Sequence, residues 1–308
     1  MVLKQITHLT SIDNLTKEQI NFILDKSKQM LNILNSKKTL NICKGKILAC
    51  LFFEASTRTR LSFEAAMHRL GGNVIGFADA STSSAKKGES LTDTIKTVQN
   101  YADIICIRHP LEGSSKLAAK YCKIPIINAG DGGHEHPTQT LMDLFTIMIK
   151  KNTISNLKIG LCGDLKFGRT THSLLQALAL FGNEIICISP EELRMPNEIK
   201  DKIQNYGGKI FQTENLNEVI NKLDILYITR IQKERFISEK EYLRLKGRYI
   251  LDKKIMSIAP KNLFIMHPLP RVDEINPEID NDKRCIYFQQ AFFGVPVRMA
   301  ILEIMLKI

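Results

Sequence analysis

The stretch that decides the fold is residues 47–70, which read ILACLFFEASTRTRLSFEAAMHRL. An apolar run typical of a buried strand leads directly into a hydroxyl- and arginine-rich helix start. The first amides of a helix have no backbone partner and point beyond its end, which the macrodipole makes partly positive. Because an anion satisfies both features, the junction predicts a phosphate site.

Each polar side chain of this junction has a predicted role. Ser56 is the candidate N-cap, and Thr57 and Thr59 add hydroxyl donors. Arg58 supplies a planar cation suited to bidentate contact with a phosphate. Arg60 lies two positions further, on another side of the helix, so we assign it to structure. The alternative is an ordinary capped helix with solvated arginines, which a Ser-Thr-Arg triplet alone does not exclude.

Length and composition indicate a globular protein of two domains. The chain has 308 residues, and we expect domains of about 150 residues each. Hydrophobic residues make up 44% and charged residues 24%; with no long apolar run and no signal pattern, this predicts a cytoplasmic protein outside the membrane. Seven cysteines occur singly, without a Cys-x-x-Cys pair, and are predicted to be buried thiols rather than zinc ligands or disulfides.

The formal charge of +11 first suggests a nucleic-acid partner. The lysines, however, are spread along amphipathic helices, aromatic residues make up only 7%, and no nucleic-acid-binding motif is present. Solvated surface and a basic site for small anionic substrates explain the charge equally well. We therefore predict no nucleic-acid partner.

Hydrophobic periodicity predicts an α/β protein with two parallel sheets flanked by helices. A leading helix at 15–34, capped at Asn14 or Thr16, precedes the first array. That array has further strands at 73–77, 103–108 and 124–128, helices at 89–101 and 114–121, and a polar loop at 79–88. The second has strands at 159–162, 184–189, 209–212, 224–229 and 262–266, with a helix at 170–181.

The domain boundary is predicted at the helix 137–150 and the polar link 151–156. The domains are then 1–150 and 151–289. A terminal helix at about 290–308, with its clearest pattern from Arg298, is predicted to pack back on the first domain, as the leading helix does.

Ligands of open parallel sheets bind beyond the carboxyl ends of the strands. The loops predicted there are rich in donors and cations: 56–59, 81–88, 108–110, 131–139, 163–169, 229–235 and 267–271. Arginines on several separate loops at one sheet edge repel one another, so an anionic ligand is expected to offset them.

Taken together, these segments resemble the catalytic chains of the aspartate carbamoyltransferase family over nearly the whole chain. The matching motifs are Phe53-Glu-Ala-Ser-Thr-Arg-Thr-Arg60, Lys86-Lys-Gly-Glu89, Ile107-Arg-His-Pro110, His136-Pro-Thr-Gln139, Gly163-Asp-Leu-Lys166, Arg230-Ile-Gln-Lys-Glu-Arg235 and His267-Pro-Leu-Pro-Arg271. The sister family acting on ornithine typically has His-Cys-Leu-Pro where this chain has Pro268. A second substrate carboxylate suits Arg169 and Arg230, which would repel the cationic side chain of ornithine.

The resemblance implies transfer of the carbamoyl group of carbamoyl phosphate to L-aspartate, an early step of pyrimidine synthesis. It implies catalytic roles for Thr59, Arg108, His136 and Lys87. It implies carbamoyl phosphate contacts from Ser56, Thr57, Arg58, Thr59, Ser83, Lys87, Arg108, His136, Gln139, Pro268 and Leu269. It implies aspartate contacts from Lys87, Arg169, Arg230, Gln232 and Leu269. Outside this context His136 would be read as a structural helix-start histidine, and His134 keeps that reading.

The resemblance also implies a homotrimer, in which Ser83 and Lys87 reach the neighbouring subunit's site. It allows for a separate zinc-binding regulatory chain, and it implies no cofactor and no metal ion in this chain. Nothing in the sequence marks a covalent nucleophile, so we expect direct displacement without an acyl-enzyme.

Two local features depart from the best-known version of the family. Phe167 stands where tyrosine is usual, and the segment with Phe292, Phe293 and Pro296 is unusually apolar. Both bear on loop latching and domain closure. Two alternatives stay open: a carbamoyltransferase for another amine, and a non-catalytic anion- or nucleotide-binding module, although the turn at 163–168 lacks Gly-x-Gly-x-x-Gly spacing.

Overall fold

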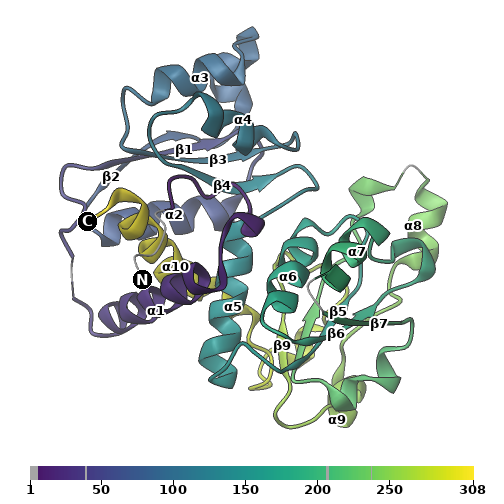
Figure 1. The fold of residues 1–308 in the computed structure, drawn as a ribbon. Helices are drawn as coiled ribbons and strands as arrows, with labels where there is room; N and C mark the ends of the chain where they lie inside the picture. The colour runs from purple at the N-terminus through teal and green to yellow at the C-terminus, as the bar shows by residue number, and fades with distance from the viewer. Residues whose placement is uncertain (1–5, 39, 206–207, 237) are drawn as a thin grey trace. The chain divides into compact units, whose positions relative to one another are not determined.

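The computed structural model describes residues 6–38, 40–205, 208–236 and 238–308. The chain forms two compact units, which we call unit 1 (Met1–Phe145 with Ala291–Ile308) and unit 2 (Thr146–Gln290). Each unit contains a parallel sheet flanked by helices, which confirms the predicted α/β class (Figure 1). The boundary between the two units falls between Phe145 and Thr146, inside the helix Pro137–Lys151. The sequence predicted this boundary after residue 150, at the end of the same helix.

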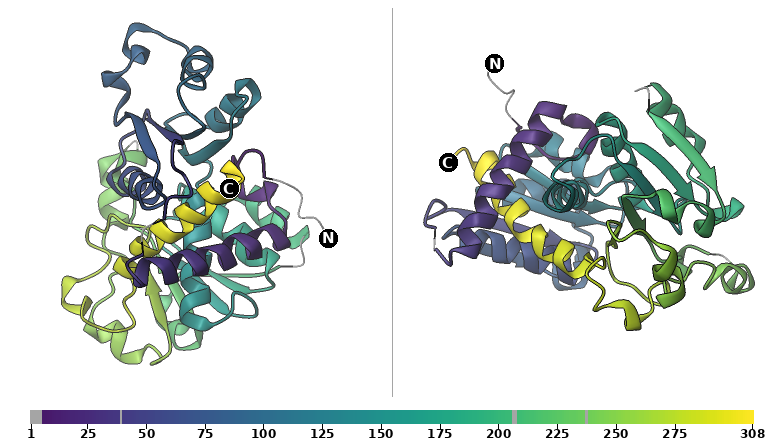
Figure 2. Two further views of the ribbon diagram at one scale, coloured as in Figure 1. Left: turned by 90° about the vertical axis from the view of Figure 1, so that its left-hand side faces the viewer. Right: turned by 90° about the horizontal axis from the view of Figure 1, so that it is seen from below.

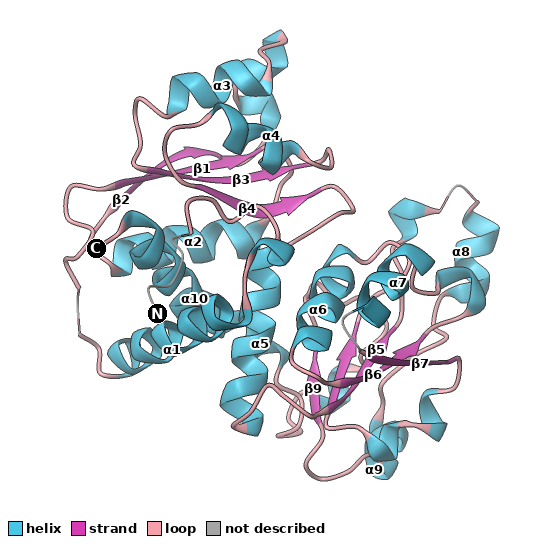
Figure 3. Ribbon diagram, viewed as in Figure 1, coloured by secondary structure: helices cyan, strands magenta, loops and turns pink. Residues whose placement is uncertain are grey.

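Unit 1 is built on a parallel sheet of strand order β2-β1-β3-β4. Its strands are β1 (Ile47–Phe52), β2 (Asn73–Phe77), β3 (Ile104–His109) and β4 (Ile126–Asp131). Its helices are α1 (Lys17–Asn35), α2 (Thr57–Arg69), α3 (Leu91–Val98), α4 (Ser114–Tyr121), the first part of α5 (Pro137–Lys151) and most of α10 (Tyr287–Leu306). Helices α3 and α4 cover one face of the sheet, and α1, α2 and α10 lie on the other (Figure 3).

Helix α10 is fastened to the rest of unit 1 by a buried arginine and an ion pair. The Arg298 guanidinium lies 5.0 Å from the centre of the Phe63 ring, and burial lowers the pKa of Arg298 to about 10. Gly294 makes room for it, because a Cβ there would come within 2.1 Å of Nη1 of Arg298. Lys26 of α1 pairs with Glu303 of α10 at 3.0 Å, and Figure 2 shows the two helices side by side. The leading and terminal helices thus pack on the body, as predicted.

Unit 2 is built on a parallel sheet of strand order β7-β6-β5-β8-β9. Its strands are β5 (Lys158–Cys162), β6 (Glu184–Ile188), β7 (Lys209–Thr213), β8 (Ile225–Ile228) and β9 (Phe264–Met266). Its own helices are α6 (Arg169–Leu180), α7 (Asn197–Asn205), α8 (Glu239–Leu245) and α9 (Lys253–Ile258). Strands β5, β6, β8 and β9 are mostly buried, as strands covered on both faces require, whereas β7 at the edge of the sheet has no buried residue.

Several local predictions need correction. Helix α10 begins at Tyr287, close to the predicted start at about residue 290 and well before the apolar pattern that begins at Arg298, because packing carries the helix through Gly294 and Pro296, both poor helix formers. Thr16, not Asn14, caps α1. The helices α7, α8 and α9 were not predicted, because each is short and its apolar period covers little more than two turns. All seven cysteines are free thiols, but one of them, Cys285, is only half-buried.

Among the described residues, no helix combines the length and the apolar character that crossing a bilayer requires.

Candidate active site

The junction of β1 and α2 has the predicted strand-to-helix geometry. Ser56 takes the N-cap position with extended backbone angles, but its side chain makes no capping hydrogen bond. Thr59 is buried in the first turn and Arg58 is exposed. Arg60 forms an ion pair with Glu64 at 3.3 Å, which agrees with the structural role assigned to it. The Ser56 hydroxyl is therefore not used as a helix cap.

Arg108 lies next to this junction because β1 and β3 are neighbours. Phe52 is paired with Arg108 in the sheet register, and the Phe53 amide donates to the Arg108 carbonyl at 2.8 Å. The Arg108 guanidinium donates to Glu54 at 2.5 Å and to the Ala129 carbonyl at 3.4 Å. We call Ser56, Thr57, Arg58, Thr59 and Arg108 the anion cradle. It combines helix N-terminal amides with two guanidinium groups, an arrangement suited to phosphate.

His136 and Gln139 lie at the start of α5, just beyond β4. His136 directly precedes Pro137, and its carbonyl accepts the amides of Gln139 at 3.0 Å and Thr140 at 3.1 Å. The Gln139 amide group donates to Asp143 at 2.9 Å. Both His136 and Gln139 are buried. The carboxyl ends of β1, β3 and β4 thus carry all the predicted unit 1 site residues except Ser83 and Lys87.

Ser83 and Lys87 lie on the segment that joins β2 to α3. The Ser83 hydroxyl donates to the Ala80 carbonyl at 2.8 Å, and Lys87 is exposed at the end of a short 3-10 turn over Ser84–Lys87. This segment is not among the elements that carry the anion cradle. The position of Lys87 is compatible with a role outside its own subunit.

Arg169, Arg230 and Gln232 follow the neighbouring strands β5 and β8 of unit 2. Arg169 is the first residue of α6, and all three residues are half-buried. The Gln232 amide contacts the buried Asp164 carboxylate at 3.4 Å, which links the two loops. Burial raises the pKa of Asp164, although hydrogen bonds from Phe167 and Gln232 oppose this shift. These loops present two cations where a dicarboxylate could bind.

A glycine permits close approach of the same two strands. Gly163 has φ +113°, and a Cβ at this position would lie 2.2 Å from the Thr229 carbonyl oxygen. No other residue fits there without moving β5 and β8 apart.

Leu269 is held by a buried histidine–glutamate pair. Its amide donates to Nδ1 of His267 at 2.7 Å, so His267 carries its proton on Nε2 and donates it to Glu274 at 2.6 Å. Burial alone would raise the pKa of Glu274, but the hydrogen bond from His267 holds it below its ordinary value. The pair fixes Leu269 at φ +57°, an unusual value for a residue other than glycine. It also sets the backbone of Pro268, beside it.

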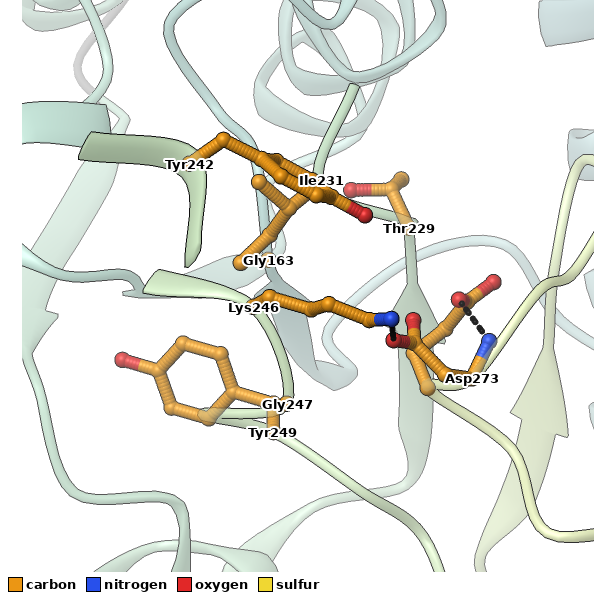
Figure 4. A pocket seen from close by; sticks show the side chains of 9 residues that line it. Gly163, Thr229, Ile231, Tyr242, Lys246, Gly247, Tyr249 and Asp273 are labelled. Carbon is orange, nitrogen blue, oxygen red and sulfur yellow. Dashed lines mark hydrogen bonds and ion pairs between the residues drawn. The ribbon is translucent and has the colours of Figure 1, made fainter. Parts of the chain in front are cut away.

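A small pocket of unit 2 is lined by residues that adjoin the predicted substrate contacts but include none of them. Figure 4 shows its lining residues, which are Gly163, Thr229, Ile231, Tyr242, Lys246, Gly247, Tyr249, Asp273 and Glu274. Lys246 and Asp273 form an ion pair at 3.5 Å. None of the residues predicted to bind aspartate lines this pocket, so we do not assign it to substrate.

Aromatic rings connect the loop after β5 with α8. The Phe167 ring makes an edge contact with Phe236, with the ring centres 6.5 Å apart, and Phe236 makes another with Tyr242, with the ring centres 5.8 Å apart. An apolar contact therefore joins the loop that carries Phe167 to the segment that carries Phe236. In unit 1, Phe293 packs against Phe145 at 5.5 Å.

Sequence reasoning missed the carboxylates that support these residues. Glu54 pairs with Arg108, Glu135 anchors the segment before His136, and Glu274 orients His267. Glu54 lies within the motif at residues 53–60 and Glu135 directly precedes the motif at residues 136–139, and these positions are the signal that could have found them. Within the described ranges, no group of three or more His, Cys, Asp or Glu side chains could hold a metal ion.

Two family models match the chain. Residues 7–149 match "Aspartate/ornithine carbamoyltransferase, carbamoyl-P binding domain", and residues 155–305 match the "Asp/Orn binding domain" of the same description.

Curated relatives and solved structures give the same result. The chain is 56% identical over 298 residues to the aspartate carbamoyltransferase catalytic subunit of Thermococcus kodakarensis, covering 97% of this chain and 96% of the relative. It resembles the crystallised catalytic subunit of M. jannaschii aspartate transcarbamoylase with TM-score 0.92 and 50% identity, covering 98% of each chain. The Trypanosoma cruzi enzyme, solved with carbamoyl phosphate and aspartate, matches with TM-score 0.90 and 37% identity over 97% of this chain and 95% of that one.

Proposed function

This chain belongs to the aspartate/ornithine carbamoyltransferase family, and from that premise we propose that it transfers the carbamoyl group of carbamoyl phosphate to L-aspartate. The products are N-carbamoyl-L-aspartate and phosphate, and the reaction serves de novo pyrimidine biosynthesis. The observation that carries the proposal is the pairing of β1 with β3, which sets Arg108 beside the α2 N-terminus. The Trypanosoma cruzi relative, which binds both substrates, supports it.

The anion cradle binds the phosphate end of carbamoyl phosphate. Thr59, Arg108 and His136 donate to the carbonyl oxygen as negative charge develops there. Such fixed donors usually provide the largest part of the rate enhancement in acyl transfer. Gln139 and the backbone at Pro268 and Leu269 orient the carbamoyl amide.

Arg169, Arg230 and Gln232 bind the aspartate carboxylates, with Leu269 alongside. Two arginines favour a dicarboxylic amino acid over one with a cationic side chain. This favours aspartate over ornithine as the acceptor.

The reaction is a direct displacement without a covalent enzyme intermediate. The aspartate nitrogen forms a bond to the carbamoyl carbon, the carbon–oxygen bond to phosphate breaks, and the departing phosphate takes the proton lost by the amine. The protein then contributes orientation and electrostatic stabilisation.

Release of phosphate from carbamoyl phosphate tests the proposal, with L-aspartate and L-ornithine compared side by side. We expect release that depends on aspartate and little with ornithine. Release with ornithine or another amine would reassign the acceptor. No release by the folded protein with any amine would favour a non-catalytic anion-binding module.

The working enzyme is proposed to be a homotrimer in which Ser83 and Lys87 complete the neighbouring subunit's site. Lys87→Ala and His136→Ala should each be inactive alone. After the two are mixed under exchange conditions, about a quarter of the sites should combine intact His136 with intact Lys87. If mixing restores no activity, Lys87 acts within its own chain. A cytoplasmic location and binding of a regulatory chain stay predictions.

A further inference from the structure

We infer that Glu135, anchored by residues 10–12, is a positioning residue that sets the place of His136. The inference rests on the proposed function, in which His136 donates to the reacting carbonyl. It concerns a carboxylate next to a predicted catalytic residue and an N-terminal segment more than a hundred residues away in sequence.

The Glu135 side chain is buried and both of its oxygens are used. Oε1 accepts the Ser11 hydroxyl at 2.6 Å, and Oε2 accepts the Ile12 amide at 2.9 Å. Only 4% of Glu135 and 2% of Ser11 are exposed, so water does not compete for these bonds. Buried hydrogen bonds to a charged group are among the stronger ones in proteins.

The backbone of Glu135 is fixed as well. Asp131 and Glu135 form an antiparallel bridge, in which the Asp131 amide donates to the Glu135 carbonyl at 3.2 Å. The Glu135 amide donates to the Asp131 carboxylate, also at 3.2 Å. Hydrogen bonds of both the main chain and the side chain therefore hold Glu135, the residue before His136.

The N-terminal segment is itself tied to β4. Leu9 lies beside the strand, donating to the Ile126 carbonyl at 2.8 Å and accepting the Asn128 amide at 2.8 Å. The Asn128 side chain donates to the Thr10 carbonyl at 2.9 Å and to the Asp131 carboxylate at 3.0 Å. A closed circuit of hydrogen bonds therefore runs from β4 through the N-terminal segment and Glu135 to Asp131.

Any shift of Glu135 is passed to His136, because the two are adjacent in the chain. A donor misplaced by about 1 Å can lower a rate about a hundredfold. The hydrogen bonds described for this circuit come from residues 9–12, 126–128, 131 and 135, whereas the anion cradle lies on other elements and contacts β4 at the Ala129 carbonyl, 3.4 Å from Arg108. We therefore expect phosphate binding to depend little on the circuit. The expected signature is thus a loss of kcat without a loss of affinity.

The test compares Glu135→Ala, Glu135→Gln and Ser11→Ala in the full chain. We expect kcat to fall about a hundredfold in Glu135→Ala and about fivefold in Ser11→Ala, which loses one hydrogen bond. Glu135→Gln can accept the Ile12 amide and donate to Ser11, so its kcat should stay within about threefold of wild type. The KM for aspartate and the Kd for inorganic phosphate should change less than about twofold.

Ser27→Ala is the matched control. Ser27 is also a buried serine of unit 1, and its hydroxyl donates to the Ile23 carbonyl at 2.7 Å within α1. It should lose stability comparable to Ser11→Ala while keeping kcat. Ser11→Ala also preserves the test if Glu135→Ala does not fold.

Three results would overturn the inference: equal kcat in Ser11→Ala and Ser27→Ala, a loss in Glu135→Gln as large as in Glu135→Ala, or a Kd for phosphate that rises in step with the fall in kcat. A wild-type protein that releases no phosphate with aspartate would overturn the proposed function instead. The two failures are therefore distinguishable.

Discussion

The predicted site residues of unit 1 and those of unit 2 differ in how firmly they are held. In unit 1, Thr59, His136 and Gln139 are buried, although Arg108 is half-buried and Arg58 is exposed. In unit 2, Arg169 and Arg230 are half-buried on loops that follow β5 and β8. Pre-ordered donors suit stabilisation of a transition state, whereas accessible cations suit capture of a ligand from solution. The comparison predicts that changes in unit 1 lower kcat and changes in unit 2 raise the KM for aspartate.

The largest effect should follow Arg108→Ala. Losing one donor to a developing oxyanion costs about 3 to 4 kcal/mol, so turnover should fall about a hundred- to a thousandfold. Phosphate-release kinetics measure it, and Arg60→Ala is the control because Arg60 pairs with Glu64 on the same helix. Near-normal turnover in folded Arg108→Ala would remove Arg108 from the reaction.

Arg230→Ala should raise the KM for aspartate about tenfold to a hundredfold, because a charge-assisted contact is worth about 1.5 to 3 kcal/mol. Binding of inorganic phosphate to the anion cradle should be unchanged, which titration calorimetry can measure. The control is Arg244→Ala, which removes a surface ion pair with Glu192. A lower kcat with an unchanged KM for aspartate in Arg230→Ala would contradict the predicted difference between the site residues of unit 1 and those of unit 2.

The contributions of two buried glutamates, Glu135 and Glu274, to folding stability should change with pH in opposite directions. Burial raises the pKa of Glu135, against the hydrogen bonds from Ser11 and Ile12. The folded state therefore binds that proton more readily, and the contribution of Glu135 to stability grows as pH falls. Glu274 has a lowered pKa, so its contribution is present above its ordinary value of 4.5 and is lost as pH falls below it.

Urea unfolding of Glu135→Gln and Glu274→Gln between pH 4 and 7 checks this difference. At neutral pH, Glu274→Gln should cost about 1 to 3 kcal/mol, and the difference from wild type should shrink in acid. Glu135→Gln should be no less stable than wild type at neutral pH, and any advantage should also shrink in acid. If both variants differed from wild type in unfolding free energy with the same sign at neutral pH, the assigned burial of Glu135 and pairing of Glu274 would be contradicted.

The smallest effect concerns two helix starts. Thr16 caps α1 with a full capping box shared with Gln19, so Thr16→Ala should cost about 1 kcal/mol. Ser56 makes no capping bond, so Ser56→Ala should change stability by less than about 0.5 kcal/mol while weakening phosphate binding. Equal falls in melting temperature in Thr16→Ala and Ser56→Ala would mean that Ser56 caps α2 after all.

The local order of strand, donor-rich loop and helix could be predicted from the sequence. The strand at residues 47–52 and the helix behind Ser56 follow from periodicity and end signals, and parallel pairing then places Arg108 beside them. The predicted substrate roles depend on the family resemblance.

The supporting contacts could not be predicted. Glu135 and Ser11 are 124 positions apart, and no local pattern relates them. Gly294 and Pro296 suggest a break in α10 because their propensities are local, whereas burial of Arg298 against Phe63 is decided by the fold. Tertiary packing overrides propensity at such positions.

The discontinuity of unit 1 has a consequence for synthesis on the ribosome. Residues 291–308, which carry Arg298 and Glu303, emerge after all of unit 2. Until then Phe63 and Lys26 lack their partners, and the sheet face beneath α10 is uncovered. Domains usually complete folding in order of synthesis, but here unit 2 can finish first while unit 1 waits for its last helix.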